Sequence, residues 1–344
     1  MRTLASPDDR PIPSIGDSTP WRLAILGAFL LFAMLVSMGT GPAQLTSTSL
    51  IEALTGGGDA ATRAIVLELR LPRTLLAALV GGGLAVSGAA FQALLRNPLA
   101  EPYVLGVSGG AAVGAVLAIV SGIAATATWG LPFAAFGGAL LAIAVVFWIA
   151  IRVGRGFDTR VLLLAGVVLG AFFNALILLL LTYSDLESFR SAMFWMMGNL
   201  TTSSWPTVAL EAAYILPMVA AMITLARAFN LLALGDDTAV YLGVRVDRVK
   251  IAAYVIASFI VAASVAACGV IGFVGLIVPH ALRLLWGGDH RFLLPGSFLA
   301  GGAFLLFADT AARTLAAPAE LPVGVITALV GVPLFVVILT RSMR

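Results

Sequence analysis

The sequence predicts an all-α membrane protein with about ten transmembrane helices. Of its 344 residues, 60% are hydrophobic and only 11% are charged, and the mean hydropathy is +1.06. A soluble domain carries about 25% charged residues. Five long segments contain no charged residue at all: 74–95, 102–151, 161–184, 251–282 and 321–340. A bilayer core requires about 20 apolar residues per helix, and backbone amides in lipid must be paired, so these segments are expected to be helical.

Prolines, glycines and polar residues divide the apolar chain into separate spans. Breaks are expected at Asn97-Pro98, 130–132, 184–190 and 318–322. At Asn97 the following proline supports the break, because proline disfavours helix at the residue before it. The segment 251–282 is too long for one span and barely enough for two. We divide it near Gly269 and Gly272, which makes its second helix short. The ten predicted spans are 21–39, 74–95, 103–121, 131–151, 161–182, 207–226, 251–268, 271–287, 293–313 and 322–340.

An even number of spans places both termini on one side of the membrane. With the amino terminus inside, 15 of the 20 Lys and Arg residues lie in cytoplasmic segments, in agreement with the positive-inside rule. We therefore predict two cytoplasmic termini. Residues 1–20 are polar with four prolines and are expected to form a disordered tail. The apolar run from Trp21 is too long for the hydrophobic region of a signal peptide, so it is predicted to be an uncleaved first span. Residues 21–344 are therefore predicted to form a single transmembrane domain.

Glycines spaced four residues apart predict close helix contacts. Gly106, Gly110 and Gly114 lie on one helical face, as do Gly166 and Gly170. Small residues let two helix backbones approach in lipid, where apolar burial does not drive helices together.

Two residue counts exclude whole classes of site. The only cysteine is Cys268, which excludes an internal disulfide and a metal site built from several cysteines. The only lysine is Lys250, and Val249 precedes it, so no G-x-x-x-x-G-K-[ST] phosphate loop is present. If ATP drives this protein, another polypeptide must bind it.

The polar segment 227–250 is the longest between cytoplasmic span ends. Its leucines around Gly235 predict two short helices joined by a turn, with Asp236 and Asp237 capping the second. The alternative is a solvated loop, but such a loop needs no leucines.

Several different short motifs follow one another in a specific order along residues 60–342. They are Arg70-Leu-Pro-Arg73, Asn97-Pro-Leu-Ala-Glu-Pro102, Leu105-Gly-Val-Ser108, Trp195-Met-Met-Gly198, Leu232-Ala-Leu-Gly235, Leu242-Gly243, the glycine-rich run from Gly269 to His280, Asp289-His-Arg291, Asp309 and Glu320-Leu-Pro-Val-Gly324. This ordered set resembles the permease subunits of type II ABC importers, the family that takes up ferric siderophores, haem and cobalamin. Within it, the chain is especially similar to the cobalamin permeases.

The resemblance implies a transport subunit rather than an enzyme. Two copies would form a pore at their interface in the inner membrane of a bacterial cell, as multi-pass proteins. Two separate ATPase subunits would bind ATP and Mg, and a soluble binding protein would deliver the cargo from outside. No cofactor, metal or catalytic residue is expected in this chain, and no nucleic acid as a partner.

The resemblance also assigns roles to individual residues. Arginines at the positions of Arg70, Arg73 and Arg313 dock the binding protein, although ordinary snorkelling at helix ends is the alternative. Reversing the charge of Arg70 and Arg73 is expected to impair docking and leave the dimer folded.

Positions matching Asn97, Leu99 and Thr159 line the cytoplasmic gate in the family. Arg160 stands where a small polar residue is expected. The segment 227–250 becomes the ATPase coupling segment, with its contacts at Leu232, Leu234, Gly235, Ala239, Leu242 and Gly243.

Two other classes of membrane protein are alternatives to an importer permease. An ion-coupled secondary transporter needs paired intramembrane carboxylates or broken helices at the midplane, and we identify only Asp309, whose (i, i+4) spacing to Arg313 favours a local ion pair. A membrane-embedded enzyme needs converging acids, bases or a nucleophile.

His280 is expected to pack between helices rather than to bind haem. Met193–Met197 suggests a short re-entrant helix that either lines the path or only packs.

Overall fold

The computed structural model describes residues 19–41, 43, 45–153 and 159–342. These residues form helices and loops without any strand, which confirms the all-α class. The tail predicted at 1–20 lies outside the described residues, except for Thr19 and Pro20, which begin the first helix.

A helix overlaps each of the ten predicted spans. These helices are α1 (Thr19–Gly39), α4 (Leu71–Leu94), α5 (Val107–Val120), α7 (Gly130–Val153), α8 (Thr159–Thr182), α10 (Trp205–Thr224), α13 (Val246–Cys268), α14 (Val274–Trp286), α15 (His290–Thr314) and α16 (Val323–Ser342). The connections contain α2 (Ser47–Leu54), α3 (Ala60–Ala64), η1 (Ile65–Arg70), η2 (Pro102–Leu105), α6 (Ile123–Thr126), α9 (Leu186–Met196), α11 (Ala226–Leu232) and α12 (Asp236–Tyr241). The break predicted near Gly269–Gly272 falls between α13 and α14.

Seven of the described helices are long and apolar enough to cross a membrane. The helices α5 and α14 are shorter, with 14 and 13 residues, and the apolar part of α16 ends at Val337. At 1.5 Å per residue, α5 and α14 cover about 20 Å of a core about 30 Å thick. Connecting segments precede them at 95–106, which contains η2, and at 269–273.

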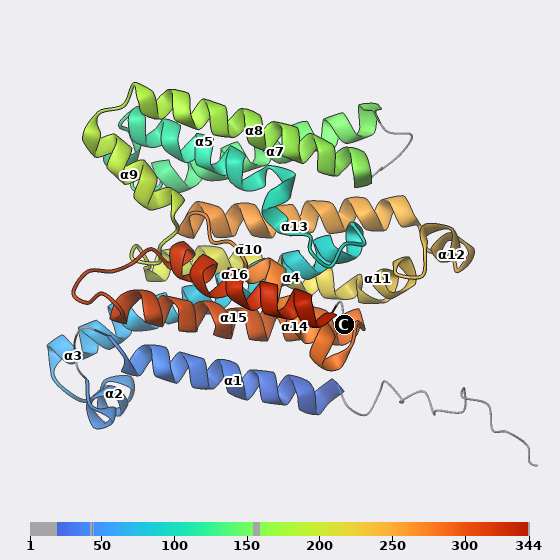
Figure 1. Ribbon diagram of the computed structural model, residues 1–344. Coiled ribbons are helices and arrows are strands. Elements are labelled where there is room, and N and C mark those ends of the chain that lie inside the picture. The colour runs from blue at the N-terminus through green and yellow to red at the C-terminus, as the bar shows by residue number, and fades with distance from the viewer. Residues whose placement is uncertain (1–18, 42, 44, 154–158, 343–344) are drawn as a thin grey trace, which may run out of the picture.

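The long helices run side by side, and short elements gather at the two ends of the bundle (Figure 1). One end carries α11, α12, the start of α1 and the end of α16, and we refer to it as the α12 end. The opposite end, the α9 end, carries α2, α3 and α9. The start of the first described helix and the end of the last one therefore lie at the same end of the bundle.

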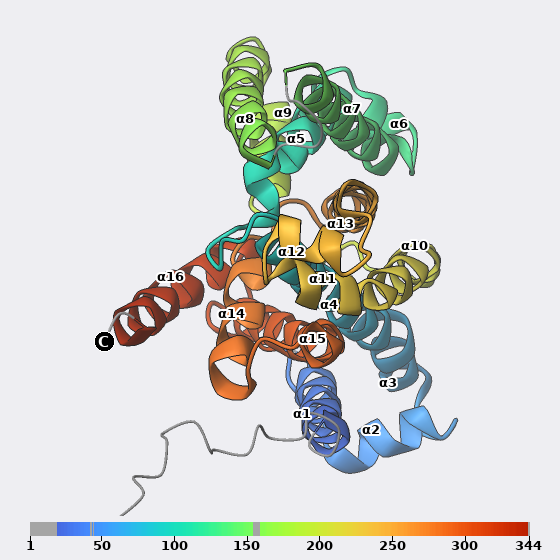
Figure 2. The ribbon, with the colours of Figure 1, turned by 90° about the vertical axis from the view of Figure 1, so that its right-hand side faces the viewer.

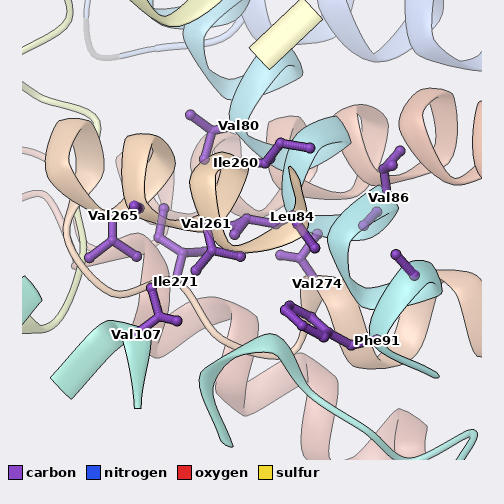
Figure 3. Packing of buried hydrophobic residues seen from close by; sticks show 14 of the residues in the cluster. Val80, Leu84, Val86, Phe91, Val107, Ile260, Val261, Val265, Ile271 and Val274 are labelled. Atoms are coloured by element: carbon purple, nitrogen blue, oxygen red, sulfur yellow. The ribbon is translucent and has the colours of Figure 1, made fainter. Parts of the chain in front are cut away.

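Helix α4 is the centre of the larger helix group, with α10, α13, α14 and α15 around it (Figure 2). Val80, Leu84 and Phe91 of α4 pack among aliphatic residues of α13 and of the segment that leads into α14 (Figure 3). Its glycines make this crowding possible. A Cβ atom at Gly81 would lie 2.4 Å from the carbonyl oxygen of Gly301, so α4 and α15 touch through their backbones.

A second group contains α5, α7 and α8, and lies beside the first (Figure 2). The predicted glycine face of α5 is confirmed, because Cβ atoms at Gly110 and Gly114 would lie 2.4 Å and 2.1 Å from backbone oxygens of α7. Gly106 approaches α8 at the Gly166 carbonyl. Gly170 is different, because no atom lies within 4 Å of the Cβ it would carry. Beside this position, therefore, α8 leaves space that none of the described residues fills.

Candidate translocation, docking and coupling sites

An ion cluster joins three elements at the α9 end. Arg73, near the start of α4, places Nη2 2.9 Å from Asp309 Oδ1 and Nη1 2.9 Å from Glu320 Oε2. Asp309 lies on α15, and its other oxygen is 3.1 Å from Nε of Arg313, one turn further along. The predicted (i, i+4) pair is therefore confirmed. Asp309 is fully buried, and these two guanidinium groups offset the cost of burying its carboxylate.

The other two predicted docking arginines bind the end of α1. Arg70 donates from Nη1 to the Met38 carbonyl at 2.6 Å and from Nη2 to the Ala43 carbonyl. Arg313 donates to the carbonyls of Ser37 and Thr40 at 3.1 Å and 3.2 Å. The last carbonyls of a helix have no partner within the helix, and a positive charge there also favours the helix dipole. The two arginines thus fix the end of α1 against α4 and α15.

These contacts bear on the proposed docking role. Arg70 and Arg313 are 6% and 4% exposed, and all three guanidinium groups have partners in the chain. Docking by these residues stays a prediction. Charge reversal at Arg73, however, would place a carboxylate beside Asp309 and Glu320, and reversal at Arg70 would leave helix-end carbonyls unpaired. The expectation that such a variant keeps its fold does not fit these contacts.

Asp309→Asn is expected to lower the unfolding free energy by about 3 kcal/mol, because it leaves two largely buried guanidinium groups without their carboxylate. Thermal unfolding of the purified protein in detergent measures this effect. Glu320→Gln is the matched control, since Glu320 is partly exposed and its pair with Arg73 is worth at most about 1 kcal/mol. Equal effects of the two substitutions would contradict the assignment.

The predicted coupling segment forms two short helices, α11 and α12, joined at Gly235, where φ is +120°. This confirms the expected pair of helices. Leu232 and Ala239 are buried and hold the pair against the bundle. Leu234 and Leu242 are 65% and 56% exposed at the α12 end.

The exposed surface of this segment is larger than predicted. Val240 and Tyr241 are 58% and 90% exposed beside Leu242, and neither was among the predicted contacts. Their position was readable from the sequence, because they lie between Ala239 and Leu242 on a helix shorter than two turns. We use the name "coupling face" for Leu234, Val240, Tyr241 and Leu242.

The expected capping of α12 by aspartates is wrong. Gly235 is the N-cap residue, and no side chain caps the helix. Asp236 instead receives Nζ of Lys250 at 2.6 Å and the guanidinium of Arg96. The Asp236 carboxylate therefore pairs with Lys250 and Arg96 instead of accepting a hydrogen bond from the backbone at the start of α12. The result ties α12 to the start of α13 and to the loop after α4.

The predicted gate residues occupy two separate elements. The side chain of Asn97 accepts a hydrogen bond from the Leu99 backbone N–H at 2.9 Å, which forms a compact turn after α4. Arg96 adopts φ +48° just before it, so α4 ends where Pro98 was expected to end it. Thr159 is the first residue of α8. Among the described residues, no hydrogen bond joins Thr159 to the Asn97 turn.

A polar clamp holds the break between α13 and α14, and the sequence analysis gave its residues no role. The Glu101 carboxylate accepts from the Phe273 N–H at 2.8 Å, and the Tyr103 hydroxyl donates to the Ile271 carbonyl at 2.8 Å. Gln92 donates to the carbonyls of Gly275 and Leu276. Non-helical backbone at membrane depth needs such internal partners. In the sequence, Glu101 is only one residue of the Asn97–Pro102 motif and Tyr103 lies in no motif, and nothing near either residue indicates a partner about 170 residues away.

An apolar groove of about 610 Å³ lies between α9 and α16. Met196 and Met197 line it, together with Phe273, Leu329 and Val332. The predicted short helix at Met193–Met197 is confirmed as α9. Met side chains adapt to irregular surfaces, so this groove can pack against a varied partner. It lies next to the clamped break, because Gly272 and Phe273 belong to both.

Two further polar groups lie within the spans. His280 is buried on α14 near Phe335 of α16, and neither ring nitrogen has a hydrogen-bond partner among the described residues. The His280 ring packs between helices as predicted, but its two nitrogens make no hydrogen bond to the described residues. Glu211 is buried on α10, so the statement that the spans offer only Asp309 was wrong. Within the described part of the chain, no three His, Cys, Asp or Glu residues are grouped to hold a metal.

Comparison with known proteins finds one family over nearly the whole chain. The model of the FecCD transport family matches residues 29–341. The chain is 41% identical to the hemin transport system permease protein HmuU of Yersinia pestis, over 92% of this chain and 96% of that protein. It is 40% identical to the vitamin B12 import system permease protein BtuC of Shigella boydii, over the full length of both. A solved inward-facing structure of a metal-chelate type ABC transporter superposes with a TM-score of 0.85 at 34% identity, covering 94% of this chain and 99% of that one.

Proposed function

This chain belongs to the FecCD transport family, and from that premise we infer that it is the membrane-spanning permease subunit of an ATP-driven importer for metal chelates. Its similarity to full-length haemin and vitamin B12 permeases supports this role. The cargo class we propose is a large metal chelate, either a corrinoid, haem or a ferric siderophore. The chain is a multi-pass membrane protein, and we place it in the inner membrane of a bacterial cell.

The single observation that carries the coupling mechanism is the coupling face. Four large apolar side chains are exposed on a short helix pair at the end of the bundle where lipid cannot cover them if the spans cross the membrane. Exposed apolar patches of this kind mark protein contacts. Since the chain has no phosphate loop, we propose that a separate ATPase binds ATP and Mg and docks there.

We propose that two copies of the chain enclose the translocation path. Two surfaces support this arrangement, because no described residue fills the groove beside α16 or the space next to Gly170 of α8. In this arrangement all ten predicted spans cross the bilayer, the α12 end is cytoplasmic, and Asn97, Leu99 and Thr159 line the inner gate. Basic residues such as Arg96, Arg152 and Arg227 on that side agree with the orientation.

The α9 end is proposed to receive an extracytoplasmic binding protein. Arg70 and Arg313 hold the end of α1 and the linker after it, and Arg73 holds Glu320 in the loop before α16. Docking then depends on these arginines through the surface that they shape, as well as through their charge.

Purification from native membranes in mild detergent tests the proposal. We expect a phosphate-loop ATPase to co-purify at one copy per permease with ATP hydrolysis, and to be lost when residues 231–243 are altered. Repeated recovery of the permease alone, without ATP hydrolysis, would contradict the importer assignment.

A further inference from the structure

A second cavity lies on the other side of the helix bundle from the α16 groove. It has a volume of about 450 Å³ and is enclosed by α7, α10, α13 and the loops at their α9 ends. None of its lining residues belongs to the coupling face, the gate or the ion cluster. Its lining includes the polar residues Thr128, Thr202 and Ser204 from these loops.

The cavity contains a buried carboxylate, that of Glu211. Glu211 lines it and is 4% exposed, and its Oε2 atom has no hydrogen-bond partner among the described residues. No salt bridge to Glu211 is present in that part of the chain either. Burying an isolated carboxylate is costly unless an opposite charge or a hydrogen-bond donor reaches it. A ligand that brings a cation would remove that cost.

Aromatic rings line the same cavity as this carboxylate. Phe133 and Phe136 come from the first turns of α7, Trp129 directly precedes that helix, and Tyr214 comes from α10, one turn after Glu211. The rings of Phe136 and Tyr214 lie 6.1 Å apart, and those of Trp129 and Phe133 lie 6.3 Å apart. Aromatic faces attract ammonium groups, and they also cover apolar carbon chains.

The remaining wall leaves room for an occupant. It is made by Ala263, Ala266 and Ala267 of α13, whose side chains end at Cβ. The lining has a single ionisable carboxylate, no Lys and no Arg. An anion therefore finds no counter-charge in the cavity, whereas a cation finds one. Phe133 is 64% exposed on α7, so the aromatic lining reaches from the cavity to the surface of the protein.

We propose that this cavity binds an amphiphile with a terminal ammonium group, with the ammonium at Glu211 and the apolar body along the aromatic wall. A membrane lipid with an amine headgroup and a soluble alkylamine share this chemistry. Binding at this site is separate from cargo transport and does not depend on the proposed function.

Native mass spectrometry of the delipidated, detergent-purified protein tests the proposal. The probes are phosphatidylethanolamine, phosphatidylglycerol with the same acyl chains, and dodecylamine. We expect at least one amine probe to bind about tenfold more tightly than phosphatidylglycerol, and Glu211→Gln to remove that preference. Phosphatidylethanolamine alone would identify a lipid headgroup, and dodecylamine alone would identify a soluble amine.

Two further variants make the result decisive. Glu187→Gln on α9 is the matched control, because Glu187 is an exposed carboxylate at the same end of the bundle, and it is expected to keep amine binding. Ala266→Leu fills the cavity without touching the carboxylate and is expected to reduce binding of both amines, which provides a test if Glu211→Gln fails to fold. Equal binding of phosphatidylethanolamine, dodecylamine and phosphatidylglycerol, or unchanged amine binding by both cavity variants, would overturn the proposal.

Discussion

Tyr241→Asp combined with Leu242→Asp is expected to abolish binding of the ATPase and, with it, transport. Both side chains are largely exposed, Tyr241 as the last residue of α12 and Leu242 directly after it, and a buried aromatic anchor at a protein interface contributes about 2 kcal/mol or more. Losing the Tyr241 anchor and the Leu242 contact, and burying two carboxylates in their place, corresponds to a weakening of at least about 1,000-fold. Co-purification of the ATPase and cargo uptake in cells lacking their own permease measure the effect.

The fold of this double variant should remain intact, because neither residue packs inside the chain. Leu186→Asp is a suitable control, since Leu186 is 70% exposed at the opposite end of the bundle, and it should leave ATPase binding unchanged. A second comparison uses Leu232→Asp, which alters a buried residue of α11 and should lower stability as well as coupling. Normal ATPase recovery with the Tyr241 and Leu242 variant would exclude the coupling face as the docking site.

The local features of the fold were predictable from the sequence. Each span, the turn at Gly235 and the pair of Asp309 with Arg313 depend on residues within a few positions of each other, where helix periodicity and backbone preferences act directly. The glycine face of α5 was predictable for the same reason, because residues four apart share a helix face.

Contacts between distant segments were not predictable. Arg73 and Asp309 are 236 residues apart in sequence, and nothing in either segment indicates that they meet. The same holds for Glu101 and Phe273. The capping prediction for Asp236 failed because Arg96 and Lys250 approach from other elements. Glu211 was missed for another reason, because one carboxylate hardly changes the hydropathy of a 20-residue span.

The length of α14 shows how tertiary packing changes a predicted span. The apolar run alone allowed a helix over 271–287, but the helix begins only at Val274. The Glu101 carboxylate and the Tyr103 hydroxyl bind the backbone at 271–273, where Phe273 adopts a left-handed conformation with φ +69°, and they hold that segment in a non-helical form. A helix there would lose these bonds and leave a partly buried carboxylate unpaired.

Gly88→Ala is expected to be among the most disruptive single-methyl changes in the chain. A Cβ atom at Gly88 would lie 1.9 Å from the carbonyl oxygen and 2.4 Å from the carbonyl carbon of Gly275. Both atoms belong to the backbone, so no side-chain rotation can relieve the overlap. Helices α4 and α14 would have to separate, and α14 begins at the clamp that closes the break. We expect the free energy of unfolding to fall by about 3 kcal/mol or more, which is the upper range for overpacking.

Gly27→Ala is the control for this change. Gly27 lies within α1, and nothing is within 4 Å of the Cβ it would carry, so alanine there should stabilise the helix by up to about 1 kcal/mol. Thermal unfolding and the monodisperse fraction in detergent report both effects. Because the two substitutions add the same methyl group to a helix, their difference isolates the contact with Gly275. Comparable stability of the two variants would mean that α4 and α14 are not in backbone contact, and the position of the clamped break would then be wrong as well.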